Sequence, residues 1–483
     1  MKVVHDYIES KLGIPFTQVS AVFGIFLTYF LAILFKFIPN SQPNLKHLFS
    51  FFFSSAIFYF LFGFSTCVDL LISPCLVYLL SLKFRTKNFF PILIFAISMG
   101  HVSYRHFHSQ FLSPSTLAFD GTAPLMVLII KLSSFGWCLH DGTKPDKELS
   151  AEQRALKIAK MPTLLEYLGY LYFFGGFLVG PAIEYKDYYN FVHGLKPFDR
   201  IPSRIPSTLK CLSMGLGFIV IYLKFEPIFN LNYCSEPWFD TLNIFFKSAF
   251  VIFSMFIART KFYIAWKLSE GACNLSGIGY NGIDENGTPV WNRGQNIKIR
   301  GFEFPTNAKM ITDSWNINTS KWLKNYVYLR LCDPRSGVST SFSTFITNLT
   351  SAFWHGFYPG YYMFFGTAAF FILVSRTCRR VLRPFFITTK LKKYKTIYDV
   401  TGIICTALSV SYMMVPFVLK SFSSSVQLWT KLWFIGHNPL RDLLNKLSKN
   451  DEHVTLNNEE EVNFKGSARE ETSKLVKRTK IYS

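Results

Sequence analysis

The feature that most constrains the fold of this chain is a series of apolar runs, many of them close to 20 residues long, that recurs from near its start to residue 419. A membrane-spanning helix needs ~20 mostly apolar residues to cross the hydrocarbon layer. Charged residues make up only 17% of the 483 residues, too few to cover the surface of a soluble domain. The sequence therefore predicts an all-α, polytopic integral membrane protein with about ten to twelve membrane helices, some of them short or re-entrant. The apolar runs cover residues 16–37, 47–62, 68–82, 89–100, 123–139, 164–181, 212–229, 242–257, 344–358, 361–374 and 400–419.

These runs also suggest how the chain is organised. We expect residues 1–440 to form one membrane domain and residues 441–483, which are polar and mixed in charge, to form a disordered tail. The first run is too long to be the apolar core of a cleaved signal peptide, so we expect it to be retained. The nine cysteines are dispersed and include no CxxC pair, which favours small buried side chains over disulfides or zinc ligands. We therefore expect no bound metal.

The chain carries a formal net charge of +21, and its basic residues lie in short clusters between apolar runs. That distribution is typical of cytoplasmic loops beside anionic lipid headgroups, and it does not resemble a nucleic-acid-binding motif. The most basic loop runs from Arg376 to Lys395, with eight Lys or Arg residues and no acidic residue. We predict that this loop lies on the cytoplasmic face of the membrane and that the partners of the chain are lipids rather than nucleic acid.

One polar stretch interrupts the membrane pattern. Residues Gly277 to Lys324 combine Asn, Arg and Glu with several tryptophans and phenylalanines, unlike a low-complexity linker. Polar backbone is tolerated at membrane depth only where it is packed in protein or lines a cavity. The segment 277–324 is therefore expected to be an ordered re-entrant or interfacial structure, and it is the prime candidate for a functional site.

His355 is the one histidine within an otherwise uncharged apolar stretch, in the region 344–365. An ionisable side chain inside a membrane segment is costly and is a functional candidate, and imidazole titrates near neutral pH, as a general base must. A structural histidine that hydrogen-bonds a neighbouring helix explains the position equally well. The chain contains no GxSxG, P-loop or HExxH motif. Other ionisable groups stand at segment ends, where solvation or helix capping is the commoner role: Asp120, Asp141, Glu166, Glu184 and Glu270.

Two motifs together make the sequence resemble a known family. The segment Trp315-Asn-Ile-Asn-Thr-Ser-Lys-Trp-Leu, followed by Ser351-Ala-Phe-Trp-His-Gly-Phe-Tyr-Pro-Gly-Tyr, is similar to the paired signature of the membrane-bound O-acyltransferase (MBOAT) family. Within that family the chain most resembles the lysophospholipid acyltransferase branch, in particular fungal enzymes of broad specificity. The resemblance covers roughly residues 16–420 and includes matching segments that begin at Leu125, Gly180 and Gly271.

The resemblance implies a helical membrane protein of the MBOAT fold with a central catalytic chamber, acyl-CoA as cosubstrate and no bound cofactor. It implies transfer of a fatty acyl chain to the free sn-2 hydroxyl of a lysophospholipid. The catalytic residues of the family fall on His355 and Asn316, which are 39 residues apart. Lipid synthesis by a multi-pass protein implies the membrane of the endoplasmic reticulum. The other residues expected to contact substrates are Arg293, Lys298, Arg300, Glu303, Trp315, Asn318 and Trp354.

The chemistry of the residues agrees with that interpretation. A thioester is already activated, so a general base suffices and no metal or covalent nucleophile is needed. The CoA phosphates require cationic partners, and the basic residues of the polar segment are candidates for them, although each is equally well explained as an anchor for lipid headgroups. These residues are Arg293, Lys298, Arg300, Lys309 and Lys321.

Three questions stay open at this point. The acceptor could instead be diacylglycerol, a sterol or a protein, or the chain could be a transporter, although it lacks paired broken helices. The third question concerns Asn316 and Asn318, which point about 200° apart on a helix, so only one can face His355. Helical spacing groups Trp315 with Asn318 and groups Asn316 with Ser320, and it does not choose between them. The resemblance selects Asn316 for catalysis and leaves Asn318 as a buried structural hydrogen-bonder.

Overall fold

The computed structural model describes residues 16–112, 121–332 and 341–437. Across these residues the protein is built from helices and turns, with two isolated β-bridges as the only strand-like pairing. The expected all-α class is therefore confirmed. The proposed boundary between the membrane domain and the tail, at residue 440, lies outside the described residues.

The first part of the described chain forms long apolar helices. These are α2 (Phe16–Lys36), α3 (Pro43–Phe84), α4 (Phe90–Phe107) and α5 (Thr122–Asp141). Helix α5 is buried over most of its surface because α3, α4 and α7 (Leu164–Leu171) pack against it. Its Lys131 is buried, and the ammonium donates to the carbonyls of Tyr170 and Leu171 at 3.0 and 3.1 Å. This lysine thereby satisfies the last turn of α7, where helix carbonyls lack partners within the helix.

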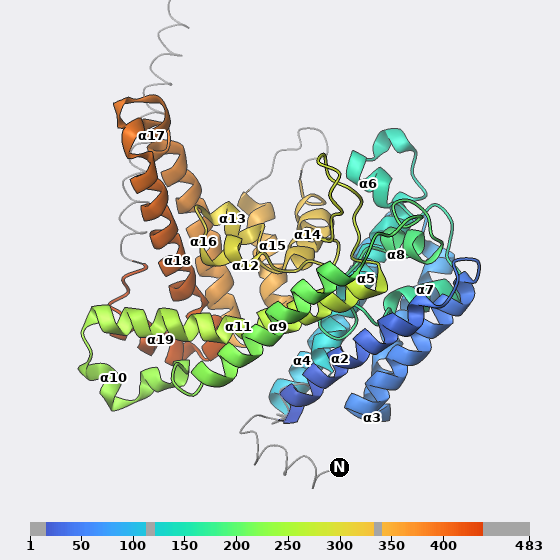
Figure 1. Ribbon diagram of the computed structural model, residues 1–483, viewed down its shortest axis with the longest axis horizontal. Helices are drawn as coiled ribbons and strands as arrows, with labels where there is room; N and C mark the ends of the chain where they lie inside the picture. Colours follow the sequence, from blue (N-terminus) through green and yellow to red (C-terminus); the bar gives the residue numbers. More distant parts are fainter. Residues whose placement is uncertain (1–15, 113–120, 333–340, 438–483) are drawn as a thin grey trace, which may run out of the picture.

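A second group of long helices crosses the first. Helix α9 (Ile205–Phe225) packs along α11 (Ile244–Ser276), and α11 also contacts α2 and α18 (Lys395–Leu419). Figure 1 shows α9 and α11 running across the molecule, between the blue N-terminal helices and the orange C-terminal ones. Helix α11 therefore links the N-terminal helix α2 to the C-terminal helix α18.

Helix α16 (Pro359–Leu382) is another long helix, and it packs against α18. Shorter elements connect the long helices. They are η1 (His108–Leu112), η2 (Asp146–Glu148), α6 (Ala151–Leu156), α8 (Tyr185–Val192), η3 (Leu231–Ser235), α10 (Pro237–Thr241), α12 (Ile299–Glu303), α13 (Ala308–Thr312), α14 (Ile317–Leu323), η4 (Lys324–Tyr328), α15 (Ser341–His355), α17 (Phe385–Thr388), η5 (Lys390–Tyr394) and α19 (Phe422–Lys431).

The number of helices that can span a membrane is smaller than the expected ten to twelve. Seven helices among the described residues are long and apolar enough to do so. The runs 47–62 and 68–82 join in α3, which is interrupted only at Gly63, with φ 81° and ψ 175°. The run 164–181 forms a helix only as far as Leu171 and then turns, and the run 344–358 forms the 15-residue α15. Helix α7 packs against α3, so it does not need the length that lipid contact demands, whereas α15 packs one face on α16 and leaves Phe345 and Leu349 exposed.

The polar segment 277–324 is ordered, as expected. The backbone N–H of Lys298 donates to Ser314 O at 2.9 Å, and that of Ile317 donates to Asn296 O at 3.0 Å. Helices α12, α13 and α14 of this segment lie between α16 and α5 (Figure 1). The segment therefore sits at the junction of the two groups of membrane helices.

Candidate active site

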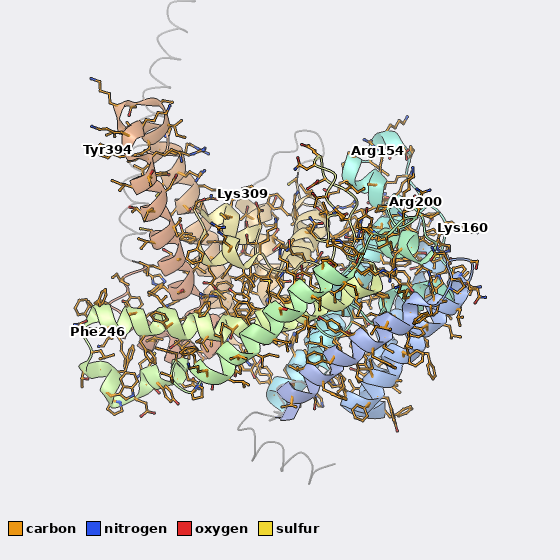
Figure 2. The ribbon with its side chains drawn as sticks, in the orientation of Figure 1. Arg154, Lys160, Arg200, Phe246, Lys309 and Tyr394 are labelled. Atoms are coloured by element: carbon orange, nitrogen blue, oxygen red, sulfur yellow. The ribbon has the colours of Figure 1, made fainter. Side chains whose placement is uncertain are left out.

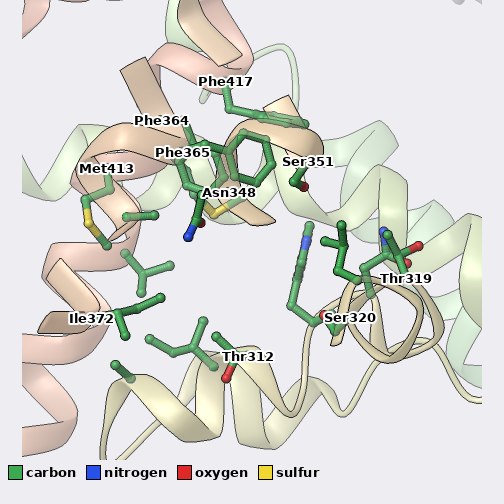
Figure 3. A pocket seen from close by; sticks show the side chains of 18 of the residues that line it. Thr312, Thr319, Ser320, Asn348, Ser351, Phe364, Phe365, Ile372, Met413 and Phe417 are labelled. Carbon is green, nitrogen blue, oxygen red and sulfur yellow. The ribbon is translucent and has the colours of Figure 1, made fainter. Parts of the chain in front are cut away.

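A cavity of about 230 Å³ lies where the polar segment meets α15, α16 and α18 (Figure 3). Most of its wall is aromatic or aliphatic, with a small number of amide, hydroxyl and imidazole groups, which is the usual make-up of a ligand site. Its lining residues are Phe262, Trp266, Phe302, Ala308, Ile311, Thr312, Trp315, Asn316, Thr319, Ser320, Leu323, Thr347, Asn348, Ser351, His355, Phe364, Phe365, Ala368, Phe371, Ile372, Val410, Met413, Met414 and Phe417.

His355 is the last residue of α15 and lines this cavity. Aromatic rings surround its imidazole. The ring of Phe365 stacks on it at a centroid distance of 5.5 Å, and the ring of Phe417 meets it edge-on at 4.9 Å. The ring orientation is therefore fixed by packing from α16 and α18, the two helices that form the far wall.

The backbone turns sharply directly after His355. Gly356 has φ 113°, a conformation that L side chains rarely adopt, and a Cβ at this position would lie 3.0 Å from Nδ1 of His106. The Nε2–H of His106, on α4, donates to the carbonyl of Trp354 at 3.0 Å. The glycine thus allows α4 to approach the end of α15 closely. His106 was not singled out from the sequence, where it lies in a stretch with several other histidines.

Asn316 lines the same cavity, and its backbone is left-handed, with φ 43° and ψ 54°. Helix α14 begins only at Ile317, so Asn316 is the residue before the helix and not part of it. The prediction that grouped Asn316 with Ser320 and Trp315 with Asn318 assumed a helix that already includes residues 315 and 316, and this assumption was wrong. The tertiary fold brings Asn316 and His355 to one cavity across 39 residues of sequence.

Two polar side chains that line the cavity from the same helix as His355 were missed from the sequence. Asn348 and Ser351 precede His355 by seven and four residues on α15, and both line the cavity. In Figure 3 the side chain of Asn348 extends into the open space. Its amide donates to Thr344 O at 2.9 Å, which leaves its carbonyl oxygen for other contacts. Helical spacing from His355 was the signal that would have identified both residues.

Trp315 and Glu303 were both expected to contact substrates, but only Trp315 lines the cavity. Trp315 lines it and packs on Phe302, with ring centroids 4.6 Å apart. Glu303 does not line it. Its carboxylate accepts from the guanidinium of Arg259 at 2.9 and 2.7 Å and from the hydroxyl of Tyr263. Arg259 is buried, so this ion pair fixes α12 on α11 and supports the wall of the cavity.

The basic residues of the polar segment do not line the cavity. Arg293 pairs with Asp187 and donates to the side chain of Asn281 at 2.7 Å. These contacts explain Arg293 as a structural residue that joins the polar segment to α8. Lys298 and Arg300, in contrast, have exposed side chains at the start of α12.

Asn318 and Trp354 also lie outside the cavity lining. The side-chain amide of Asn318 donates to Asn296 Oδ1 at 2.8 Å, and its backbone N–H donates to the same oxygen at 3.2 Å. The indole of Trp354 donates to Met126 O at 3.1 Å, which ties α15 to α5. The structure therefore places these two residues in the framework around the cavity rather than in its lining.

The ionisable groups at segment ends have structural partners. Asp141 receives hydrogen bonds of 3.0 and 2.5 Å from Arg330, Glu166 caps α7, and Glu270 pairs with Lys267 at 2.6 Å. Glu184 is enclosed beside Tyr326, and burial raises the pKa of its carboxyl to about 7. Asp120 lies outside the described residues.

The cavity thus combines an imidazole, two amides and hydroxyl groups within apolar walls. An imidazole in this setting can take a proton from a bound hydroxyl, and an amide can donate a hydrogen bond to charge that develops on a carbonyl oxygen. The apolar walls limit the access of water, which would otherwise compete as an acceptor.

Comparison with known proteins gives a consistent result. Residues 107–415 match the model of the membrane-bound O-acyltransferase family. The chain is 37% identical over 449 residues to a protein of Schizosaccharomyces pombe named lysophospholipid acyltransferase, covering 89% of this chain and 86% of that one. It is 35% identical over 435 residues to the Saccharomyces cerevisiae protein of the same name, covering 83% of this chain and 69% of that one. It is 35% identical over 338 residues to the human membrane-bound glycerophospholipid O-acyltransferase 2, covering 66% and 62% of the two chains.

Proposed function

Since this chain belongs to the membrane-bound O-acyltransferase family, we propose that it transfers a fatty acyl chain from acyl-CoA to the free hydroxyl of a lysophospholipid, with His355 as the general base. The observation that carries this proposal is the meeting of His355 and Asn316 in one apolar cavity. The transporter alternative is set aside, because the family is one of acyltransferases.

The proposed reaction uses this cavity in two steps. The imidazole of His355 accepts the proton of the lysophospholipid hydroxyl while the oxygen attacks the thioester carbonyl. The amide of Asn316 donates a hydrogen bond to the charge that develops on that carbonyl oxygen, or positions the attacking group. When the C–S bond breaks, the imidazolium returns its proton to the CoA thiolate, so the enzyme ends in its starting state.

We also propose acyl-CoA as the acyl donor and the endoplasmic reticulum as the location. Acyl-CoA is an activated thioester, and the groups of the cavity suffice for its transfer without a further cofactor. Its phosphates require cationic partners, and Lys298 and Arg300 are exposed candidates whose side chains form no hydrogen bond or ion pair in the described part of the chain. We place the enzyme in the membrane of the endoplasmic reticulum, where phospholipids are made and remodelled.

The test is a transfer assay with purified protein, one labelled acyl-CoA and competing acceptors. We expect labelled phospholipid as the main product from lysophospholipid, diacylglycerol and sterol offered together. His355→Ala should lower the rate by roughly 10²–10⁴-fold at unchanged abundance, the usual loss when a general base is removed. His108→Ala is the matched control, because His108 does not line the cavity and should keep normal activity.

Two results would contradict the proposal. Triacylglycerol or steryl ester as the dominant product would assign a different acceptor to the same fold. Near-normal turnover by His355→Ala would remove the histidine from the chemistry.

A further inference from the structure

Three metal-ligating side chains gather away from the cavity, where α3 meets α7 and α8. His47 comes from the first turns of α3, Glu166 from the first turn of α7, and His193 directly follows α8. Each offers one ligand atom, and the three atoms lie within 4.8 Å of one another. Figure 1 shows α3, α7 and α8 together at the right of the molecule. Lys160 and Arg200, on the loops that flank α7 and α8, lie near the same edge (Figure 2).

His47 contributes a nitrogen that lacks a partner. Its side chain is only 1% exposed, and its Nδ1 lies 3.0 Å from the hydroxyl of Tyr188. Within the described residues its Nε2 is buried and has no hydrogen-bond partner. A buried polar atom without a hydrogen-bond partner destabilises the fold, so its presence requires an explanation.

The other two residues are oriented as metal ligands are. The Nδ1–H of His193 donates to Tyr189 O at 2.9 Å, which leaves the lone pair of the neutral ring on Nε2. In Glu166 the oxygen Oε2 accepts from the backbone N–H and the hydroxyl of Thr163 at 2.7 and 2.9 Å. This capping contact fixes the carboxylate and does not use its other oxygen, Oε1.

The expectation that no metal is bound rested on the cysteines, none of which belongs to this cluster. We propose, against that expectation, that His47, Glu166 and His193 bind a divalent transition-metal ion, Zn²⁺ by preference. Two imidazoles and one carboxylate with an open fourth position for water are a common ligand set for zinc. Zinc–ligand bonds of ~2.0–2.2 Å require the three atoms to stand roughly 3.4 Å apart, which is compatible with three atoms that lie within 4.8 Å of one another. Lys46, the neighbouring residue with positive charge, directs its ammonium to Asn40 and to Val192 O.

The site does not share residues with the cavity, so the ion would take no direct part in acyl transfer there. It would join the start of α3 to α7 and α8, in addition to contacts such as the hydrogen bond from Lys46 to Val192 O and the packing of Tyr188 on His47. The alternative is a metal-free network in which His47 and His193 hydrogen-bond Glu166 directly.

The experiment measures zinc bound to the purified full chain after dialysis, together with its thermal unfolding. Glu166→Gln is the sharpest variant, because glutamine also completes a capping box but lacks the negative charge. His193→Gln tests a second ligand, and His108→Gln is the matched control outside the site. We expect about one zinc ion per chain in the wild type and in His108→Gln, with the affinity lowered by more than about 10-fold in the two ligand variants.

A chelator provides a second measurement that does not depend on the folding of any variant. Removal of zinc from the wild type should lower its melting temperature, and added zinc should restore it, because a ligand that binds only the folded state stabilises it. The proposal is wrong if the chelator leaves the melting temperature of the wild type unchanged. It is equally wrong if the wild type and the ligand variants retain the same amount of zinc.

Discussion

Asn316 and Asn318 are two residues apart and have different environments. Asn316 adopts a left-handed conformation that asparagine tolerates better than most residues, and it lines the cavity. Asn318 donates two hydrogen bonds to the side chain of Asn296, and these bonds hold the start of α14 to the preceding loop. The two amides are therefore expected to fail in different ways when they are removed.

We predict that Asn316→Ala loses most activity at normal abundance. Asn318→Ala should instead lower stability by ~1–3 kcal/mol, because a half-buried amide pair is broken. Asn316→Gly is the control for backbone strain, since glycine adopts φ 43° without cost and also removes the amide. Specific activity and thermal stability of the three variants decide the question. An active Asn316→Gly beside an inactive Asn316→Ala would mean that the conformation matters and the amide does not.

Gly356 gives a second prediction at this scale. Gly356→Ala introduces a Cβ at φ 113° and 3.0 Å from the ring of His106, so either this ring or the backbone next to His355 has to shift. Strain of ~1–3 kcal/mol is expected from the backbone alone, and a misplaced base lowers the rate further. We expect loss of most activity with the protein still in the membrane.

The two causes can be separated by adding His106→Ala to this variant. Partial recovery of activity in the double variant would show that the contact with the ring contributes, because the backbone strain remains. An active and stable Gly356→Ala would contradict the prediction.

At the scale of elements, α12 and α14 depend on anchors outside the cavity. The ion pair between Arg259 and Glu303 holds α12 on α11, and the indole of Trp322 donates to Ser133 Oγ at 2.8 Å to hold α14 on α5. The cavity is therefore positioned by contacts to two different membrane helices. The start of α12 carries the exposed Lys298 and Arg300, while Arg293 is committed to Asp187.

We predict that neutralising Lys298 and Arg300 together raises the KM for acyl-CoA several-fold and leaves the KM for the lysophospholipid nearly unchanged. The reason is that contacts with phosphates in the ground state act chiefly on binding. Lys309→Gln is the control, since Lys309 lies in the same segment and pairs with Asp313. Arg293→Gln should differ from both by lowering thermal stability. Equal increases in both KM values for the double variant would point to misfolding instead.

At the scale of the whole molecule, the hairpin of α16 and α18 extends beyond the other helices. Figure 1 shows α17 and the adjoining turn at its tip, apart from the rest of the protein. The tip contains the most basic part of the chain, and the side chains from Phe385 to Tyr394 are largely exposed. A basic tip at the end of an apolar hairpin is typical of a cytoplasmic loop that contacts anionic headgroups.

We therefore predict that the tip faces the cytoplasm. A protease recognition site inserted after Thr389 should be cleaved in sealed microsomes when the protease is added outside. The same recognition site introduced next to Asn232, in the connection between α9 and α11, is the comparison. It shows whether this connection is protected from the protease until detergent is added. Cleavage at the tip only after detergent would reverse the orientation.

Much of this fold follows from the sequence alone. Apolar runs of the right length, such as 16–37 and 400–419, determine membrane helices because lipid offers no other partner for the backbone groups. The polarity of 277–324 predicts an ordered segment packed within protein, since polar backbone at membrane depth has to be satisfied there. His355 is identified as a candidate because an ionisable group in an apolar run is costly.

Other properties were decided only by the tertiary structure. Periodicity could not place Asn316, because the helix begins one residue later and the left-handed turn is set by contacts with the preceding loop. Periodicity also could not show that Arg293 forms an ion pair with Asp187, or that His106 packs on Gly356, because these contacts join residues more than 100 positions apart. Local composition fixes which segments enter the membrane, because that depends on transfer of each segment from water. Which side chains meet in the cavity depends on how the helices cross, and that is a property of the packed molecule alone.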